Sequence, residues 1–176
     1  MTKQLWAVLL ALAISSPVVS SAPVECPALT VSQKVVLMKT WRYGEEKWGK
    51  GKGAKLSAVA LQESHLGVNI HGNGSYGIFQ LKPTTVAFME GRKDTKGIKR
   101  RLNNDFQYSA TQAHNYLAYW EEKGYSGSRV YQRYNGGYSD SKKSRHYAKQ
   151  VQKKTKLLNQ CYVYRDGALH ERNKHS

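Results

Sequence analysis

Glu63 is the residue whose position gives it the clearest potential for chemistry. Leu56, Val59 and Ala60 recur at helical spacing, and Glu63 continues their face seven positions after Leu56. A carboxyl group on a core-facing surface loses hydration when it ionises, so its pKa should rise. A raised pKa is what a general acid requires near neutral pH. We therefore predict a catalytic role for Glu63, the alternative being a capping or ion-paired glutamate at a helix end.

Further polar residues follow Glu63 in an ordered series. The series consists of Glu63-Ser64, Gly77-Ile78-Phe79-Gln80, Tyr134-Asn135-Gly136-Gly137 and Tyr147. It resembles the soluble lytic transglycosylase family, whose pattern is Glu-Ser, Gly-Leu-Met-Gln, Ala-Tyr-Asn-Ala-Gly and a late Tyr. The resemblance extends over about residues 54–151. Each motif alone is weak, but all of them in this order at plausible spacing form a specific signal.

The glycine-rich segment before Gln80 has a second resemblance. Residues 71–77, His-Gly-Asn-Gly-Ser-Tyr-Gly, are similar to the corresponding part of goose-type lysozymes. Those enzymes share the fold of the soluble lytic transglycosylases and hydrolyse the bond that the transglycosylases cleave. Glycine, asparagine and serine favour turns, so residues 67–77 are expected to form an irregular or hairpin-like insert. These residues do not distinguish hydrolysis of the bond from cleavage without water.

The main resemblance implies cleavage of the β-1,4 bond between N-acetylmuramic acid and N-acetylglucosamine in peptidoglycan. Glu63 would protonate the glycosidic oxygen and then accept a proton from the C6 hydroxyl, which gives a 1,6-anhydro sugar. A hydrolytic muramidase acting on the same bond is the alternative. The residues that the resemblance assigns to substrate binding are Ser75, Phe79, Gln80, Tyr134, Asn135 and Tyr147.

Individual roles are expected for some of these residues. Gln80 and Asn135 would form hydrogen bonds with the substrate, and Tyr134 would orient Glu63 or the sugar. Tyr147 would shape the site or simply pack. Ser64 is expected to form a contact at the end of its helix. A serine nucleophile would need His and Asp partners, and no such pattern accompanies Ser64.

The sequence departs from the family pattern at three positions. Phe79 stands where Met is usual, and as an apolar exchange it is expected to preserve a wall that contacts sugar. Arg133 and Gly136 replace two small Ala residues. Arg133 is expected to add charge beside the site and to affect subsite preference.

A second catalytic carboxylate is not obvious in the sequence. Hydrolytic glycosidases usually need two. Asp105 is better explained as a helix N-cap, while Glu45 and Glu46 follow the first helix and could approach the site only through tertiary folding. This favours the non-hydrolytic route. His65 and His71 flank the glycine-rich segment without further ligands at metal spacing, so neither a metal nor any other cofactor is expected.

The composition predicts an anionic partner. Of the 176 residues, 28 are Lys or Arg and 12 are Asp or Glu, which gives a formal net charge of +16. Such a charge suits nucleic acid, an acidic membrane surface or an acidic polymer. Because the family resemblance supplies peptidoglycan strands and the anionic cell wall as partners, a nucleic-acid-binding or membrane-binding module is the remote alternative. A monomer is expected.

The first residues predict export. Leu5–Ile14 is an apolar run that Ser15, Ser16 and Pro17 interrupt, which is typical of a signal peptide over residues 1–22 and too short for a spanning helix. The protein is then expected in the periplasm or cell-wall space, without a permanent membrane anchor. Its setting stays open between phage lysis, wall opening for a secretion or conjugation apparatus, and wall remodelling. Cys26 and Cys161 should form a disulfide in an oxidising compartment.

The elements that must position these residues are mostly helical. Residues 162–176 are expected to be a polar, loose tail, and residues 90–101, with six Lys or Arg, a solvated loop. The catalytic domain is expected to span residues 23–161, as a mainly α (α+β lysozyme-like) single domain with a small irregular or β-like insert near the active site. The predicted helices cover residues 30–43 (ended by Gly44), 54–65, 105–123 (capped by Asp105), 130–134 and 142–158.

Overall fold

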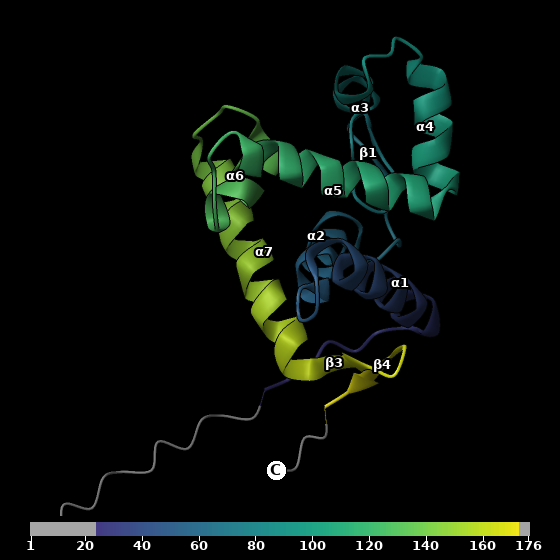
Figure 1. The fold of residues 1–176 in the computed structure, drawn as a ribbon, viewed down its shortest axis with the longest axis vertical. Coiled ribbons are helices and arrows are strands. Elements are labelled where there is room, and N and C mark those ends of the chain that lie inside the picture. Colours follow the sequence, from purple (N-terminus) through teal and green to yellow (C-terminus); the bar gives the residue numbers. More distant parts are fainter. Residues whose placement is uncertain (1–23, 173–176) are drawn as a thin grey trace, which may run out of the picture.

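The computed structural model describes residues 24–172, and the predicted signal peptide lies outside these residues. Within them the chain forms seven helices and two small two-stranded sheets (Figure 1), which confirms the mainly α prediction. The elements are α1 (Val31–Trp48), α2 (Gly53–Ser64), β1 (His71–Gly72), β2 (Ser75–Tyr76), α3 (Pro83–Glu90), α4 (Thr95–Asn104), α5 (Phe106–Glu122), α6 (Ser128–Gly136), α7 (Lys142–Cys161), β3 (Tyr162–Arg165) and β4 (Ala168–Glu171).

Helix α2 is enclosed on most of its sides, with nine of its twelve residues buried. Small residues at its beginning allow α1 to approach closely. A Cβ added at Gly44 would lie 2.9 Å from the Cα of Gly53, and Thr40 and Ser57 share a buried hydrogen bond of 2.9 Å between their hydroxyls. The prediction that Gly44 ends the first helix is therefore wrong. Glycine is needed there for helix packing, and α1 continues to Trp48.

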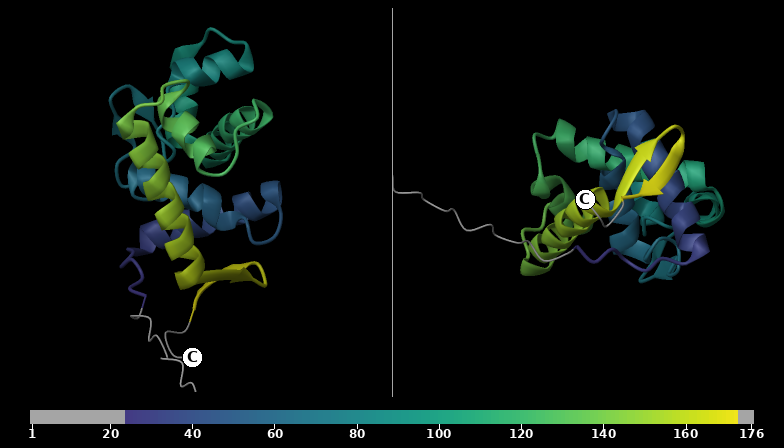
Figure 2. Two further views of the ribbon diagram at one scale, coloured as in Figure 1. Left: turned by 90° about the vertical axis from the view of Figure 1, so that its left-hand side faces the viewer. Right: turned by 90° about the horizontal axis from the view of Figure 1, so that it is seen from below.

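Helix α5 lies between α3 and α4 on one side and α1 and α2 on the other, as Figures 1 and 2 both show. Its predicted N-cap is confirmed, because Asp105 accepts a hydrogen bond of 2.9 Å from the backbone N–H of Tyr108. Phe106 begins the helix, and its buried residues include Ala110, Ala113 and Leu117. The helix therefore links the two halves of the molecule through its buried residues.

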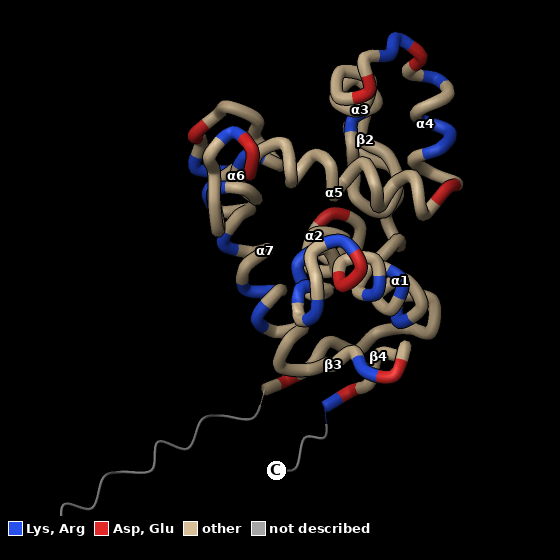
Figure 3. The backbone as a smooth tube through the Cα atoms, viewed as in Figure 1, with Lys and Arg blue, Asp and Glu red and all other residues tan. Residues whose placement is uncertain are grey.

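The basic segment after α3 forms a helix, so the prediction of a solvated loop over residues 90–101 is wrong for most of its length. Asp94 caps α4 by accepting a hydrogen bond of 2.9 Å from the N–H of Gly97. Ile98 and Leu102, four residues apart, are buried against the core. Two apolar residues one turn apart are sufficient to hold this helix, while its Lys and Arg residues are exposed. Figure 3 marks their positions along α4.

The chain beyond α7 is ordered up to residue 172, in contrast to the expected loose tail. Strands β3 and β4 pair antiparallel, with Val163 opposite His170. Asp166 and Gly167 connect them with φ values of +52° and +75°. An Asp-Gly pair with two positive φ angles is a favoured two-residue hairpin turn. Figure 2 shows this hairpin at the end of α7.

A disulfide joins Cys26 to Cys161, as the sequence predicted. The two residues are 135 positions apart, so the bond ties the segment before α1 to the last residue of α7. Cys161 is fully buried, and its carbonyl accepts a hydrogen bond of 2.7 Å from the N–H of Arg172.

In the part of the chain that the structure describes, no helix has the length and apolarity that crossing a bilayer requires.

Removing the disulfide should lower the free energy of unfolding by about 4–5 kcal/mol, because a cross-link over a loop of this length restricts the unfolded chain strongly. The double variant Cys26→Ser/Cys161→Ser avoids a lone reactive thiol. Urea denaturation at pH 6 compares it with the oxidised wild type, and the reduced wild type serves as the matched control. An unchanged denaturation midpoint in both would contradict this prediction.

Candidate active site

Glu63 lies in a cleft of about 600 Å³. One wall comes from the β1–β2 hairpin and the start of α3, and the other from the end of α6 and the start of α7. Glu63 of α2 and Tyr116 of α5 lie between the walls. The predicted site residues that line the cleft are Glu63, Ser75, Gln80, Tyr134 and Asn135. Residues far apart in the sequence are therefore assembled around one carboxyl group.

Glu63 is held by Tyr147. The tyrosine hydroxyl donates a hydrogen bond of 2.6 Å to Oε1 of Glu63. Tyr147 belongs to α7 and is buried, with 7% of its surface exposed. Of the two roles considered for Tyr147, the structure therefore shows a direct contact with the carboxyl group in addition to packing. A short bond to a charged acceptor is among the stronger hydrogen bonds in proteins.

Burial raises the pKa of Glu63 to about 7, from an ordinary value of 4.5. The hydrogen bond from Tyr147 and the positive charge of Lys154 act in the opposite direction, because both favour the ionised form. Lys154 is itself half-buried, which lowers its pKa, and its Nζ donates a hydrogen bond of 2.7 Å to Oε1 of Gln62. At neutral pH the protonated and ionised forms of Glu63 are thus similarly populated.

Gln80 is positioned by a strained turn. Its φ of +46° lies in the left-handed region, which side chains other than glycine rarely adopt. Its Nε2 donates to the carbonyls of Gly77 (2.9 Å) and Asn69 (3.3 Å). Both amide hydrogens are thereby occupied, so the side-chain oxygen is the group of Gln80 that can accept a hydrogen bond from a ligand.

Gly77 fixes the base of the same turn. Its φ is +76°, and a Cβ at this position would collide with the carbonyl of Leu102 in α4. Its N–H donates to the carbonyl of Ile70 (2.9 Å) and to the side chain of Asn103 (3.0 Å). The glycine of the Gly-Ile-Phe-Gln motif is therefore required because the insert packs directly on the backbone of α4.

Phe79 is fully buried and does not line the cleft, so a sugar-contacting wall at this position does not fit the structure. Its side chain belongs to the core, and its carbonyl accepts a hydrogen bond of 2.8 Å from the hydroxyl of Tyr134. The Tyr134 ring lines the cleft and lies 5.3 Å from the ring of Tyr116, centroid to centroid. Tyr134 thus joins the two walls, and Tyr147 rather than Tyr134 orients Glu63.

Asn135 and Ser75 face the cleft from opposite walls. Asn135 is exposed, and neither side chain forms a hydrogen bond with any residue in the described range 24–172. Asn135 is followed by Gly136, where a Cβ would lie 2.8 Å from the Cβ of Ser144 at the start of α7. Glycine replaces the family's alanine here because α6 and α7 approach too closely for a side chain.

Arg133 does not line the cleft, so the charge expected beside the site is directed elsewhere. Its Nη1 donates to the carbonyls of Gly137 (3.3 Å) and Ser139 (3.2 Å), and its guanidinium lies 4.6 Å from the centroid of the Tyr125 ring. Arg133 supports the chain between α6 and α7. Ser64 forms the expected helix-end contact, since its hydroxyl donates to Ala60 and accepts from the N–H of Gly67.

All twelve acidic residues of the chain lie within residues 24–172, and Glu63 is the one among them that lines the cleft. Glu45 accepts hydrogen bonds from the N–H groups of Gly51 (2.7 Å) and Gly53 (2.9 Å), so it closes the α1–α2 turn. Glu46 pairs with Arg42 on the surface, and Asp105 caps α5. The three carboxylates considered as partners of Glu63 are therefore engaged elsewhere.

Some residues of the cleft and its surroundings are not among the predicted site residues. Tyr116 and Lys154 were not singled out, although Lys154 lies seven residues after Tyr147 and hence on the same face of α7. Within residues 24–172, no group of three or more His, Cys, Asp or Glu residues could hold a metal ion. The other missed residues of the cleft are Leu81, Lys82, Thr85, Ser141 and Lys143.

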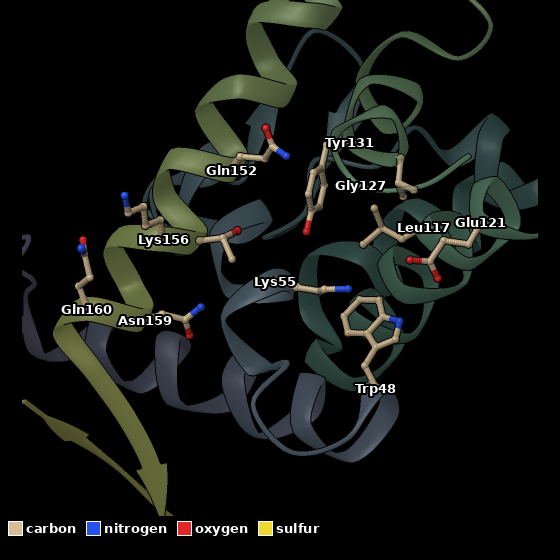
Figure 4. Close-up of a pocket in the computed structure, with 12 residues that line it drawn as sticks. Trp48, Lys55, Leu117, Glu121, Gly127, Tyr131, Gln152, Lys156, Asn159 and Gln160 are labelled. Atoms are coloured by element: carbon tan, nitrogen blue, oxygen red, sulfur yellow. The ribbon is translucent and has the colours of Figure 1, made fainter. Parts of the chain in front are cut away.

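A second cavity, of about 560 Å³, lies away from Glu63 (Figure 4). Trp48, Leu117 and Tyr131 give it a largely apolar lining, and Gln152 and Lys156 of α7 lie along its edge. None of the predicted site residues lines it. The polar cleft around Glu63 is therefore the candidate active site.

Comparison with known families gives one result. The model of the family described as the transglycosylase SLT domain matches residues 40–157, about two thirds of the chain. This range includes Glu63, Tyr147 and both walls of the cleft. Neither a search of curated proteins nor a search of solved structures finds a match.

The raised pKa of Glu63 predicts a pH-dependent stability difference for Glu63→Gln. Between pH 4.5 and about 7 the folded state holds a proton that the unfolded state releases, so ionisation of Glu63 destabilises the fold as pH rises. Relative to wild type, Glu63→Gln should gain about 3 kcal/mol in free energy of unfolding between pH 4 and pH 8. Urea denaturation at the two values measures this gain. The surface variant Glu46→Gln is the matched control. If Glu63→Gln shows no gain in stability relative to wild type, the carboxyl group of Glu63 is not buried in the folded protein.

Proposed function

The chain belongs to the transglycosylase SLT domain family, and on this premise we propose that it is a peptidoglycan lytic transglycosylase with Glu63 as its single acid and base. Members of this family are peptidoglycan lytic transglycosylases. The observation that carries the proposal is the hydrogen bond from Tyr147 to a carboxyl group that is buried at the base of a polar cleft. That arrangement supports proton transfer in both directions at one residue.

In the first step Glu63 donates its proton to the glycosidic oxygen, and the bond from that oxygen to C1 of N-acetylmuramic acid breaks. In the second step the C6 hydroxyl of the same sugar gives its proton to Glu63, and its oxygen bonds to C1. The carboxyl group ends as it began, and no water is consumed. A pKa of about 7 suits both steps, because the acid and its conjugate base are then of similar free energy.

Tyr147 stabilises the carboxylate between the two steps. Its hydroxyl donates to Oε1 of Glu63, and this bond becomes stronger when the acceptor is ionised. Burial raises the pKa of Tyr147 well above its ordinary value, with the charge of Glu63 adding to the effect, so the hydroxyl keeps its proton. Tyr147 therefore acts as a fixed donor that orients the carboxyl group without competing as an acid.

The positions of the other carboxylates favour this route over hydrolysis. Two-carboxylate glycosidases place the second carboxyl group roughly 5–10 Å from the first. In this chain Glu45 closes a turn, Glu46 forms a surface ion pair and Asp105 caps a helix. A C6 hydroxyl of the bound sugar has an effective molarity as high as roughly 10⁵–10⁸ M. It can therefore outcompete water without a carboxylate to activate it. Hydrolysis of the same bond is the alternative that the product distinguishes.

The substrate is proposed to lie between the two walls. The side-chain oxygen of Gln80 and the unpaired groups of Ser75 and Asn135 would bond to hydroxyl and acetamido groups of the sugars. The rings of Tyr116 and Tyr134 offer apolar faces at the base of the cleft. We also propose that the protein is exported and acts as a monomer on the anionic wall, with the basic residues of α4 and α7 contributing attraction (Figure 3).

Replacing the carboxyl group should abolish the reaction. Glu63→Gln keeps the shape of the side chain but removes the proton that is transferred, and cleavage of purified peptidoglycan should fall at least about 10²–10⁴-fold. Release of soluble fragments from sacculi measures the rate. Glu46→Gln, a surface carboxylate on α1, is the matched control and should retain wild-type activity. A folded Glu63→Gln variant that still cleaves peptidoglycan would exclude Glu63 as the acid and base.

The product should carry 1,6-anhydro-N-acetylmuramic acid ends. Such ends are lighter than hydrolysed ends by one water and are not reduced by borohydride. Mass spectrometry of the soluble fragments after borohydride treatment counts the two kinds of end. Digests made with a hydrolytic muramidase provide the control for reducible ends. Predominantly reducible ends from this protein would show that water attacks C1, and would make it a muramidase.

A further inference from the structure

Two lysines line the cleft, one from each wall. Lys82 immediately precedes α3, and Lys143 lies in the first turn of α7. Both are exposed, and neither takes part in an ion pair with any residue in the range 24–172. Glu63 supplies the cleft's carboxyl group, and it must be protonated to act as an acid. The cleft that receives substrate therefore carries two positive charges with no negative charge to balance them.

Helix stability does not account for these lysines. The beginning of a helix carries a partial positive charge, so a cation there is slightly unfavourable. Lys82 occupies the N-cap position of α3 without a side-chain capping bond. Lys143 follows Ser141, which caps α7 by accepting from the N–H of Ser144 (3.1 Å). Each lysine thus lies where a neutral or acidic residue would stabilise its helix better.

The chemistry of peptidoglycan offers a partner for both charges. The glycan backbone of alternating N-acetylated sugars is neutral, so two cations would contribute little to binding it. The lactyl group of each N-acetylmuramic acid, however, carries a short stem peptide with free carboxylates. A lysine places a compact charge on a flexible chain, which suits a carboxylate on a mobile branch better than a fixed bidentate contact.

We propose that Lys82 and Lys143 make the cleft selective for glycan strands that bear carboxylate-carrying stem peptides, an inference that rests on the proposed function. The strand lies along the cleft beside Glu63, and the stem peptides on its muramic acid residues extend toward the lysines on the walls. Peptide-free strands fit the same cleft but lose these contacts. Substrate choice is then decided by charge on the branches, while cleavage is decided by Glu63.

The experiment compares three soluble substrates made from one preparation of uncrosslinked strands. The first keeps its stem peptides. The second has them removed by an amidase that cuts between the muramic acid and the peptide, and the lactyl carboxylates that this cut exposes are then coupled to ammonia as neutral amides. The third keeps the peptides, but carbodiimide coupling to ammonia converts their carboxylates into neutral amides. Anhydro ends formed per minute give kcat/KM for each substrate. The third substrate separates the charge of the peptide from its bulk.

Wild type should cleave the first substrate about five- to tenfold faster than the second or third, since two exposed charge pairs contribute up to about fivefold each. Lys82→Gln/Lys143→Gln should reduce this preference to less than about twofold. Lys50→Gln/Lys52→Gln removes the same charge from exposed positions in the α1–α2 turn and should keep the wild-type preference. Circular dichroism checks that each variant is folded.

The outcomes separate the two proposals. If wild type cleaves all three substrates at equal rates, or if the cleft double variant keeps the full preference, the role of the lysines is wrong and the proposed reaction stands. A preference for the first and third substrates over the second would assign selectivity to the peptide rather than its charge, and would also overturn this inference. If no substrate yields anhydro ends, the proposed function itself fails.

Discussion

The contact between Tyr147 and Glu63 is the interaction on which the rest of the structure depends. It joins α2 to α7 at the point where the core meets the cleft, and it places a carboxyl group where water cannot fully hydrate it. Keeping such a group buried is unfavourable once it ionises, so the fold must hold both helices firmly. The enclosure of α2 supplies this, because nine of its residues are buried and the helix packs against both α1 and α7.

Close backbone contacts are the means by which this small domain builds its site. Gly44 meets Gly53 where α1 crosses α2, Gly77 meets the end of α4, and Gly136 meets the start of α7. At each place a single Cβ would push two elements apart. These glycines therefore act on Glu63 indirectly, since they set the distances between the helices and the hairpin that surround it.

Much of the fold could be predicted from the sequence, because helical periodicity and caps are local. Helix α2 and the cap at Asp105 follow from such signals, and so does the raised pKa of Glu63.

The predictions were wrong where tertiary contacts determine the local structure. Gly44 reads as a helix end but is a packing contact, and the two buried residues of α4 are too few to outweigh its charges in a sequence pattern. The Asp166-Gly167 turn was a local signal for the C-terminal hairpin, and it was overlooked. Phe79 occupies a motif position, yet motif order alone does not distinguish a cleft wall from the core behind it.

The disulfide also determines how the domain presents itself to a polymer mesh. It gathers the segment before α1, the end of α7 and the final hairpin at one pole of the molecule. The insert, the end of α6 and the start of α7, which form the cleft, lie toward the opposite pole (Figure 1). Residues 24 and 172 therefore leave the domain behind the working face. With the proposed function, the domain would enter a crowded network with its cleft leading and with the ends of the folded domain trailing, clear of the bound strand.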